Sequence, residues 1–225
     1  MNTPVSININ NLTLKVNKGV LIDDFNIEIN ESGLYFLTGE NGCGKSTFLK
    51  TLCKIHDLYE GDVFIQNKKI KTWTNSELSK VVAFVNNYRA YNDYFSAKEL
   101  VSLGNVFNSN SDINKQTELA MERMSILHLQ NRSVHELSDG EYQKVNIARA
   151  LSQNTPILLL DEPSAFLDYP SKIKLFQMLQ DLAVKDKKLI FCSTHDIELA
   201  KGFSSHFLHF QHGKIELMNS APDWH

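Results

Sequence analysis

The sequence has little cysteine and no long apolar run. Its three cysteines, Cys43, Cys53 and Cys192, are scattered and form no C-x-x-C pair, which argues against a disulfide scaffold and a zinc site. No apolar run approaches the roughly 20 residues that a membrane-spanning helix needs. The N-terminal MNTPVSININ has neither a basic segment nor an apolar core, so no signal peptide is expected. The formal net charge of −3 gives no electrostatic footprint for binding nucleic acid.

The composition is that of a folded globular chain. Hydrophobic residues make up 42% of the 225 residues, which is enough for a substantial core and excludes a disordered chain. A chain of this length suits one large domain, or a core with a small insert.

Short apolar runs alternate with helical patterns along the chain. Strands are predicted at 5–16, 21–29, 34–37, 61–66, 81–85, 157–160, 189–192, 207–210 and 214–218. Helices are predicted at 48–55, 98–103, 115–127 and 171–185. Because strands alternate with helices, the sequence predicts an α/β fold around a parallel sheet. Apolar runs become scarce between 87 and 155, so this stretch is interpreted as a helical insert in a core formed by 1–86 and 156–225.

A glycine-rich loop follows the apolar strand at 34–37 and opens a helix. The loop consists of Gly39, Glu40, Asn41, Gly42, Cys43, Gly44, Lys45, Ser46 and Thr47. This is the P-loop pattern in the context that it requires, in which glycines let backbone N–H groups surround phosphates. Lys45 is expected to reach the β- and γ-phosphates, and the Ser46 hydroxyl to bind Mg²⁺. The alternative is an ordinary glycine turn, which would match the fixed positions by chance roughly one time in a hundred.

Two further buried strands end in polar residues. The run ILLL at 157–160 ends in Asp161 and Glu162, and the strand at 189–192 is followed by His195. Since ligands bind at the carboxyl ends of strands in open α/β sheets, Asp161 is expected to hold Mg²⁺ and Glu162 to orient or deprotonate an attacking water. His195 is placed to hydrogen-bond the γ-phosphate, although a lone histidine after a strand is more often structural. His209 and His212 are interpreted as surface residues.

A capped helix starts within LSDGEYQKVNIARAL, residues 137–151. Ser138 and Glu141 form a capping box, and an apolar face follows at Tyr142, Val145, Ala148 and Leu151. A helix N-terminus favours an anion, although Asp139 and Glu141 already place negative charge there. The motif alone leaves open whether this is a plain helix start or a phosphate site.

The motifs together resemble the nucleotide-binding subunit of an ABC transporter, in order and spacing over essentially the whole length. GENGCGKST is similar to the Walker A motif, ILLLDEP to Walker B, LSDGE to the LSGGQ signature, SAFLD to the D-loop, and His195 to the switch histidine. The resemblance implies a P-loop NTPase core with a mostly parallel sheet, an N-terminal antiparallel β part and a helical insert that carries the signature.

The resemblance also implies a role for each motif residue. The catalytic residues would be Glu162, His195 and Lys45. ATP would be bound by residues 39–47 and by Asn87, Ser138, Gly140 and Asp168, and Mg²⁺ by Ser46, Asp161 and Asn87. In the family the signature contacts the ATP of the opposite subunit, so Ser138 and Gly140 would bind the partner's nucleotide. Two subunits would close on two ATP molecules and reopen after hydrolysis.

Three positions depart from the family pattern. Asn87 aligns with a glutamine and is one methylene shorter, so coupling or hydrolysis is expected to be slower than with glutamine. Asp139 replaces the first glycine of the signature pair and is expected to face away from the nucleotide. Val16 aligns with an aromatic residue that stacks on adenine, and an aliphatic contact is less directional, so weak discrimination between ATP and GTP is expected.

The details around 74–104 are similar to importers of iron–siderophore complexes, heme or cobalamin. The partners would be a second ATPase subunit, as a homodimer or a pair, transmembrane permease subunits and, indirectly, a substrate-binding protein, with no nucleic acid. The chain would then sit peripherally on the cytoplasmic face of the inner membrane. The alternatives are an ABC exporter, a non-transport ABC ATPase such as an iron–sulfur assembly ATPase, and a P-loop kinase, which would leave LSDGEYQK unexplained.

Overall fold

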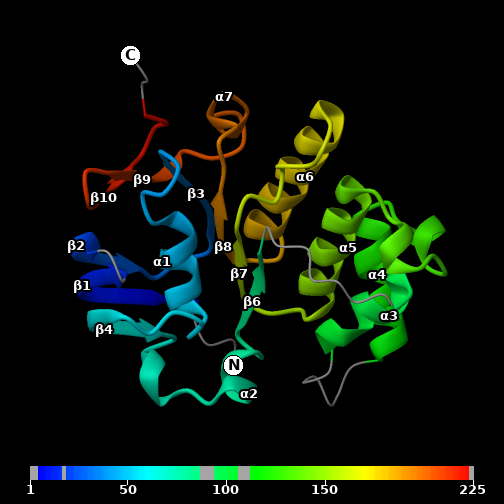
Figure 1. The fold of residues 1–225 in the computed structure, drawn as a ribbon, viewed down its shortest axis with the longest axis horizontal. Coiled ribbons are helices and arrows are strands. Elements are labelled where there is room, and N and C mark those ends of the chain that lie inside the picture. Colours follow the sequence, from blue (N-terminus) through cyan, green and yellow to red (C-terminus); the bar gives the residue numbers. More distant parts are fainter. Residues whose placement is uncertain (1–4, 17–18, 87–93, 106–111, 223–225) are drawn as a thin grey trace.

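The larger of two sheets has the strand order β10-β9-β3-β8-β7-β6 and lies at the centre of the molecule (Figure 1). The computed structural model describes residues 5–16, 19–86, 94–105 and 112–222. The strands of this sheet are β3 (Gly33–Gly39), β6 (Val82–Val85), β7 (Ile157–Leu160), β8 (Leu189–Ser193), β9 (His206–Gln211) and β10 (Lys214–Met218). Every neighbouring pair is parallel except β9 with β10, which form a hairpin. The predicted α/β fold with a mostly parallel sheet is confirmed.

The smaller sheet is antiparallel and has the order β2-β1-β4-β5. Its strands are β1 (Ile7–Val16), β2 (Gly19–Ile29), β4 (Tyr59–Ile65) and β5 (Lys68–Lys69). Ile7 and Ile9 of β1 are buried with the period of two that the sequence predicts, and a register shift after Ile9 moves the next buried pair to Leu12 and Leu14. This sheet is the expected N-terminal antiparallel part, and its position beside α1 is visible at the left of Figure 1.

The helix α1 (Lys45–Leu52) lies between the two sheets, and α6 (Tyr169–Val184) covers the opposite face of the central sheet (Figure 1). Phe48 of α1 is fully buried, and its ring lies 5.9 Å from that of Phe25 and 5.7 Å from that of Phe210. On the other face, the rings of Phe36 and Phe176 lie 5.0 Å apart. The two faces therefore have separate apolar cores.

A group of helices lies to one side of the central sheet and is drawn at the right of Figure 1. It contains α3 (Ala97–Ser102), α4 (Ile113–Arg123) and α5 (Asp139–Ser152), while the short helices α2 (Asn75–Leu78) and α7 (Ile197–Ala200) belong to the core side. The predicted face of α5 is largely buried, but Ile147 and Ala150 are buried as well. This helix is packed on more than one side, because α3, α4 and the central sheet all contact it. Among the described residues, no helix is long and apolar enough to cross a bilayer.

Candidate active site

Three of the predicted groups meet at one edge of the central sheet. The strands β3, β7 and β8 are parallel neighbours, with Leu37 opposite Ser193 and Leu160 opposite Cys192. Their carboxyl ends therefore lie side by side, and each leads into one predicted motif. This edge brings the glycine-rich loop, the carboxylates Asp161 and Glu162, and His195 together.

The glycine-rich loop folds around the ammonium group of Lys45. Its Nζ donates to the carbonyl oxygens of Gly39, at 2.7 Å, and Glu40, at 3.0 Å. Gly39, Gly42 and Gly44 have φ angles of 141°, 80° and 113°, which only glycine adopts readily. Because Gly44 allows the chain to turn directly into α1, the helix begins at Lys45, earlier than the predicted 48. The positive charge and the N-terminus of α1 together make an anion-binding concavity.

We expect Gly39→Ala to lower the free energy of unfolding by about 3 kcal/mol, since it combines left-handed backbone strain with a steric clash. A Cβ at this position would lie 2.4 Å from the carbonyl oxygen of Phe210 on β9, which is backbone and cannot rotate away. Gly42→Ala is the matched control, because nothing lies within 4 Å of its Cβ. The control should cost only about 1 kcal/mol, from φ alone. Equal losses for both variants in urea unfolding would contradict the clash.

The carboxylates are held by a residue that the sequence did not single out. The Ser193 hydroxyl donates to Asp161 Oδ1 at 2.8 Å and accepts the N–H of Glu162, also at 2.8 Å. Glu162 has a φ of 48°, an unusual value for a non-glycine residue and one that is found at functional sites. Asp161 is buried, whereas the Glu162 side chain is partly open to solvent. In the sequence, Ser193 could have been identified by its position at the end of β8, the strand next to β7.

Glu162 and His195 contact each other directly. His195 Nε2 lies 2.7 Å from Glu162 Oε1, and the two side chains are 44% and 27% exposed. A carboxylate in contact with an imidazole, both beside a phosphate-binding loop, can accept or relay a proton from a water at that edge. The structure thus brings together two residues that are 33 positions apart in the sequence.

The signature turn, residues 137–141, lies at the start of α5. Ser138 and Glu141 form the predicted capping box, in which Ser138 Oγ accepts the Glu141 N–H at 3.3 Å and Glu141 Oε2 accepts the Ser138 N–H at 2.9 Å. The bonds from Ser138 lower the pKa of the Glu141 carboxyl. Asp139 is exposed, and Gly140 lies so close to loop 163–168 that a Cβ would approach the Phe166 carbonyl oxygen to 2.8 Å.

The remaining predicted site residues have different surroundings. Asp168 caps α6 by accepting the Ser171 N–H at 3.2 Å, and hydrogen bonding from Ser171 lowers its carboxyl pKa. Val16 ends β1 and is half-buried. Asn87 lies outside the described residues. In Figure 1, α1 and α5 pack against opposite faces of the central sheet.

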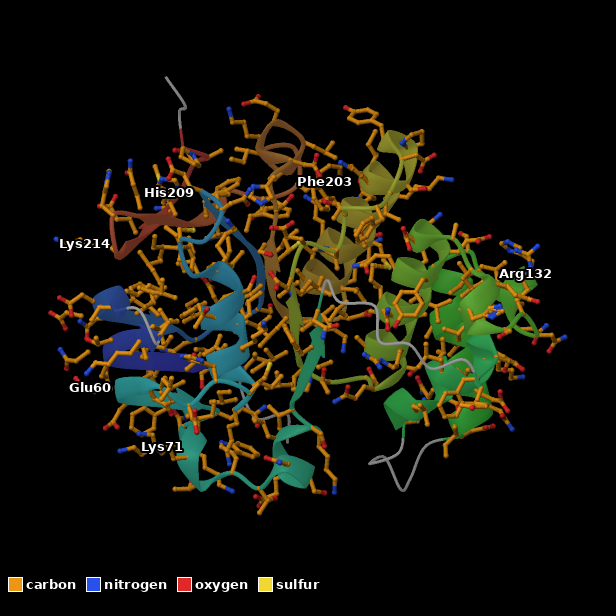
Figure 2. All side chains as sticks on the ribbon, in the orientation of Figure 1. Glu60, Lys71, Arg132, Phe203, His209 and Lys214 are labelled. Atoms are coloured by element: carbon orange, nitrogen blue, oxygen red, sulfur yellow. The ribbon has the colours of Figure 1, made fainter. Side chains whose placement is uncertain are left out.

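The interpretation of His209 as a surface residue is wrong. It is 8% exposed on β9, and its Nδ1 lies 3.1 Å from Thr38 Oγ1 on β3. Burial lowers the pKa of its imidazole. Figure 2 shows His209 on the β9 side of the molecule, above α1. The sequence predicts β9 itself but cannot show that it pairs with β3 and so buries this side chain.

Cys43 is the cysteine that we expect to react with maleimide. Its sulfur lies 3.7 Å from Lys45 Nζ, and the residue is half-buried within the loop. Burial raises the pKa of both Cys53 and Cys192, which leaves their thiols protonated and unreactive. ATP in the loop should protect Cys43. Mass spectrometry of the modified chain, with and without ATP, checks this, and modification of Cys53 at the same rate would contradict it.

The fold and the loop define a P-loop NTPase, and comparison with known proteins identifies the class. The family model described as "ABC transporter" matches residues 22–165. The iron(3+)-hydroxamate import ATP-binding protein FhuC of Bacillus subtilis is 31% identical over 202 residues, which are 87% of this chain and 75% of that protein. The hemin import ATP-binding protein HmuV of Aliivibrio fischeri is 30% identical over 224 residues, 97% and 85% of the two chains.

Solved structures agree. The ATP-binding cassette MJ0796, a dimer in a post-hydrolysis state with ADP and Pi, superimposes with a TM-score of 0.85 at 27% identity, covering 97% of this chain and 100% of that one. The chain belongs to the ABC transporter family, as an ATP-binding subunit that hydrolyses ATP. Cassettes of this kind dimerise and work with membrane permease subunits.

Proposed function

We propose that this chain powers the import of an iron chelate, heme or a cobalamin-type compound. The proposal is supported by relatives whose names state that they import iron(3+)-hydroxamate, hemin and ferric enterobactin, each at about 30% identity across most of the chain. The chain would act peripherally at the cytoplasmic face of the membrane, with a permease and a substrate-binding protein. An exporter is the competing function, and its structural relative, at 22% identity, shares the fold alone.

The contact between His195 and Glu162 carries the proposed chemistry. Glu162 orients the attacking water and accepts its proton. His195 holds Glu162 in place, and His195 also hydrogen-bonds the γ-phosphate. Lys45 and the backbone N–H groups of residues 39–47 bind the β- and γ-phosphates. When the reaction ends, loss of the phosphate removes the contacts that favoured the closed form.

The residues at the sheet edge fit Mg²⁺. Asp161 offers a buried carboxylate and Ser46 a hydroxyl at the start of α1, which are the oxygen ligands that this ion prefers. Asp161 is already oriented by Ser193, so its carboxylate needs little reordering. Bound Mg²⁺ would neutralise charge that develops on the transferred phosphoryl group.

Two copies would pair head to tail, so that Ser138 and Gly140 of one copy contact the ATP bound by the other. The placement of α1 and α5 against opposite faces of the central sheet supports this arrangement. Asp139 is exposed and begins the helix, where a carboxylate stabilises the dipole from outside.

Uptake by cells tests the cargo. A strain that lacks this gene should lose uptake of ⁵⁵Fe-siderophore, labelled heme or cobalamin, and the wild-type gene should restore it whereas a Glu162→Gln gene should not. The protein should co-purify from membranes with a polytopic permease. Unchanged uptake of all three compounds, together with raised intracellular retention of another compound, would favour the exporter instead.

A further inference from the structure

A partly buried network of hydrogen bonds lies beside the proposed catalytic pair and includes Lys172, which belongs to none of the motifs. Lys172, on the first turn of α6, donates from Nζ to Asp196 Oδ1 at 2.8 Å. The other oxygen of the same carboxylate, Oδ2, accepts the Ser164 hydroxyl at 2.8 Å. The network therefore joins three segments: α6, the loop after β7 and the loop after β8.

The network lies next to the contact between Glu162 and His195. On one side, Ser193 at the end of β8 accepts the N–H of Glu162. On the other, Asp196 in the loop after β8 accepts the hydroxyl of Ser164. The two residues between these hydrogen bonds, Glu162 and His195, are thereby held face to face at 2.7 Å. Asp196 N–H also donates to Thr194 Oγ1 at 3.0 Å, which fixes the turn that carries His195.

The negative charge of the carboxylates at this edge of the sheet favours a cation beside Asp196. Asp161, Glu162 and Asp196 place three carboxylates just after the ends of two adjacent strands, and neighbouring like charges repel. Lys172 is the cation that contacts Asp196 in the described part of the chain. Its side chain is 21% exposed and that of Asp196 is 29% exposed, so solvent screens this pair less than a surface ion pair.

We infer that Lys172 is a positioning residue for ATP hydrolysis, which acts through Asp196 and Ser164 to keep His195 against Glu162. Lys172 does not touch the nucleotide loop, so it affects the chemical step and leaves ATP binding unchanged. This inference rests on the proposed roles of Glu162 and His195.

The test is steady-state ATP hydrolysis by the full chain carrying Lys172→Met, Lys172→Arg or Lys174→Met. Lys172→Met should lower kcat about fivefold, equivalent to about 1 kcal/mol in the activation barrier, with KM for ATP changed less than about twofold. Lys172→Arg keeps the ion pair and should restore kcat. Lys174→Met removes an exposed lysine from the same helix and should behave as the wild type.

A double variant tests whether Lys172 and Asp196 act as one pair. Lys172→Met and Asp196→Asn should be non-additive, because each breaks the same ion pair, and the double variant should lose no more kcat than the worse single variant. Unchanged kcat in Lys172→Met, an equal change in kcat and KM, or failure of arginine to rescue would each overturn the inference.

The failure of the inference can be told apart from the failure of the proposed function. If Glu162→Gln abolishes hydrolysis while Lys172→Met keeps full kcat, the positioning role alone is wrong. If Glu162→Gln hydrolyses ATP normally in the same assay, the catalytic proposal itself fails, and the inference fails with it.

Discussion

Glu162→Gln should reduce ATP hydrolysis by a factor of about 10³, since it removes the proposed general base and keeps the shape of the side chain. The amide can still accept a hydrogen bond from His195, and the left-handed backbone at φ 48° is unaffected by the change. ATP binding should persist, because the phosphates are held by residues 39–47. With saturating ATP the variant should accumulate as a closed dimer, detected by size-exclusion chromatography with light scattering.

The control for this prediction is Glu198→Gln on α7. Its side chain is exposed and pairs with the nearby Lys201, at 2.7 Å, so the same chemical change there should leave hydrolysis at the wild-type rate. A Glu162→Gln chain that turns over ATP within tenfold of the wild type would show that another group takes the proton. A chain that stays monomeric with ATP and its permease would contradict the paired-subunit mechanism.

The parts of the site that the sequence predicts are those defined by local spacing. Residues 39–47 contain the whole loop, and the rule that parallel strands end at one edge brings Asp161, Glu162 and His195 to it. The capping box at Ser138 is equally local, as are those at Thr74 and Ser96, which follow the same S/T-x-x-E pattern.

What the sequence could not predict depends on which distant segments meet. Ser193 contacts Asp161 across 32 positions, and Lys172 contacts Asp196 across 24, and both contacts follow from strand register and helix placement. His209 and Thr38 are 171 positions apart, and only the pairing of β9 with β3 buries the histidine. Polar residues after a strand mark candidate positions, but the partner of each emerges only when the sheet order is known.

A mixture of two inactive chains should recover activity if the signature acts across the dimer. Gly140→Asp adds a Cβ where the Phe166 carbonyl oxygen would lie 2.8 Å away, and a carboxylate at the anion-binding helix start, so it should abolish hydrolysis. Lys45→Ala should abolish it through the phosphate loop. Mixed equally, half of the randomly formed pairs contain one chain of each kind, and each such pair keeps one intact site. About a quarter of the wild-type rate should therefore return.

A second mixture is the matched control, because Lys45→Ala and Glu162→Gln both lie in the site of their own chain. A mixed pair of these variants contains one site without its lysine and one without its base, so no intact site forms and no activity should return. The contrast follows from the proposed pairing and from the structure, since α5 and α1 pack against opposite faces of the central sheet while Glu162 and the loop 39–47 share one edge. Recovery in both mixtures, or in neither, would show that the start of α5 does not serve the partner's nucleotide.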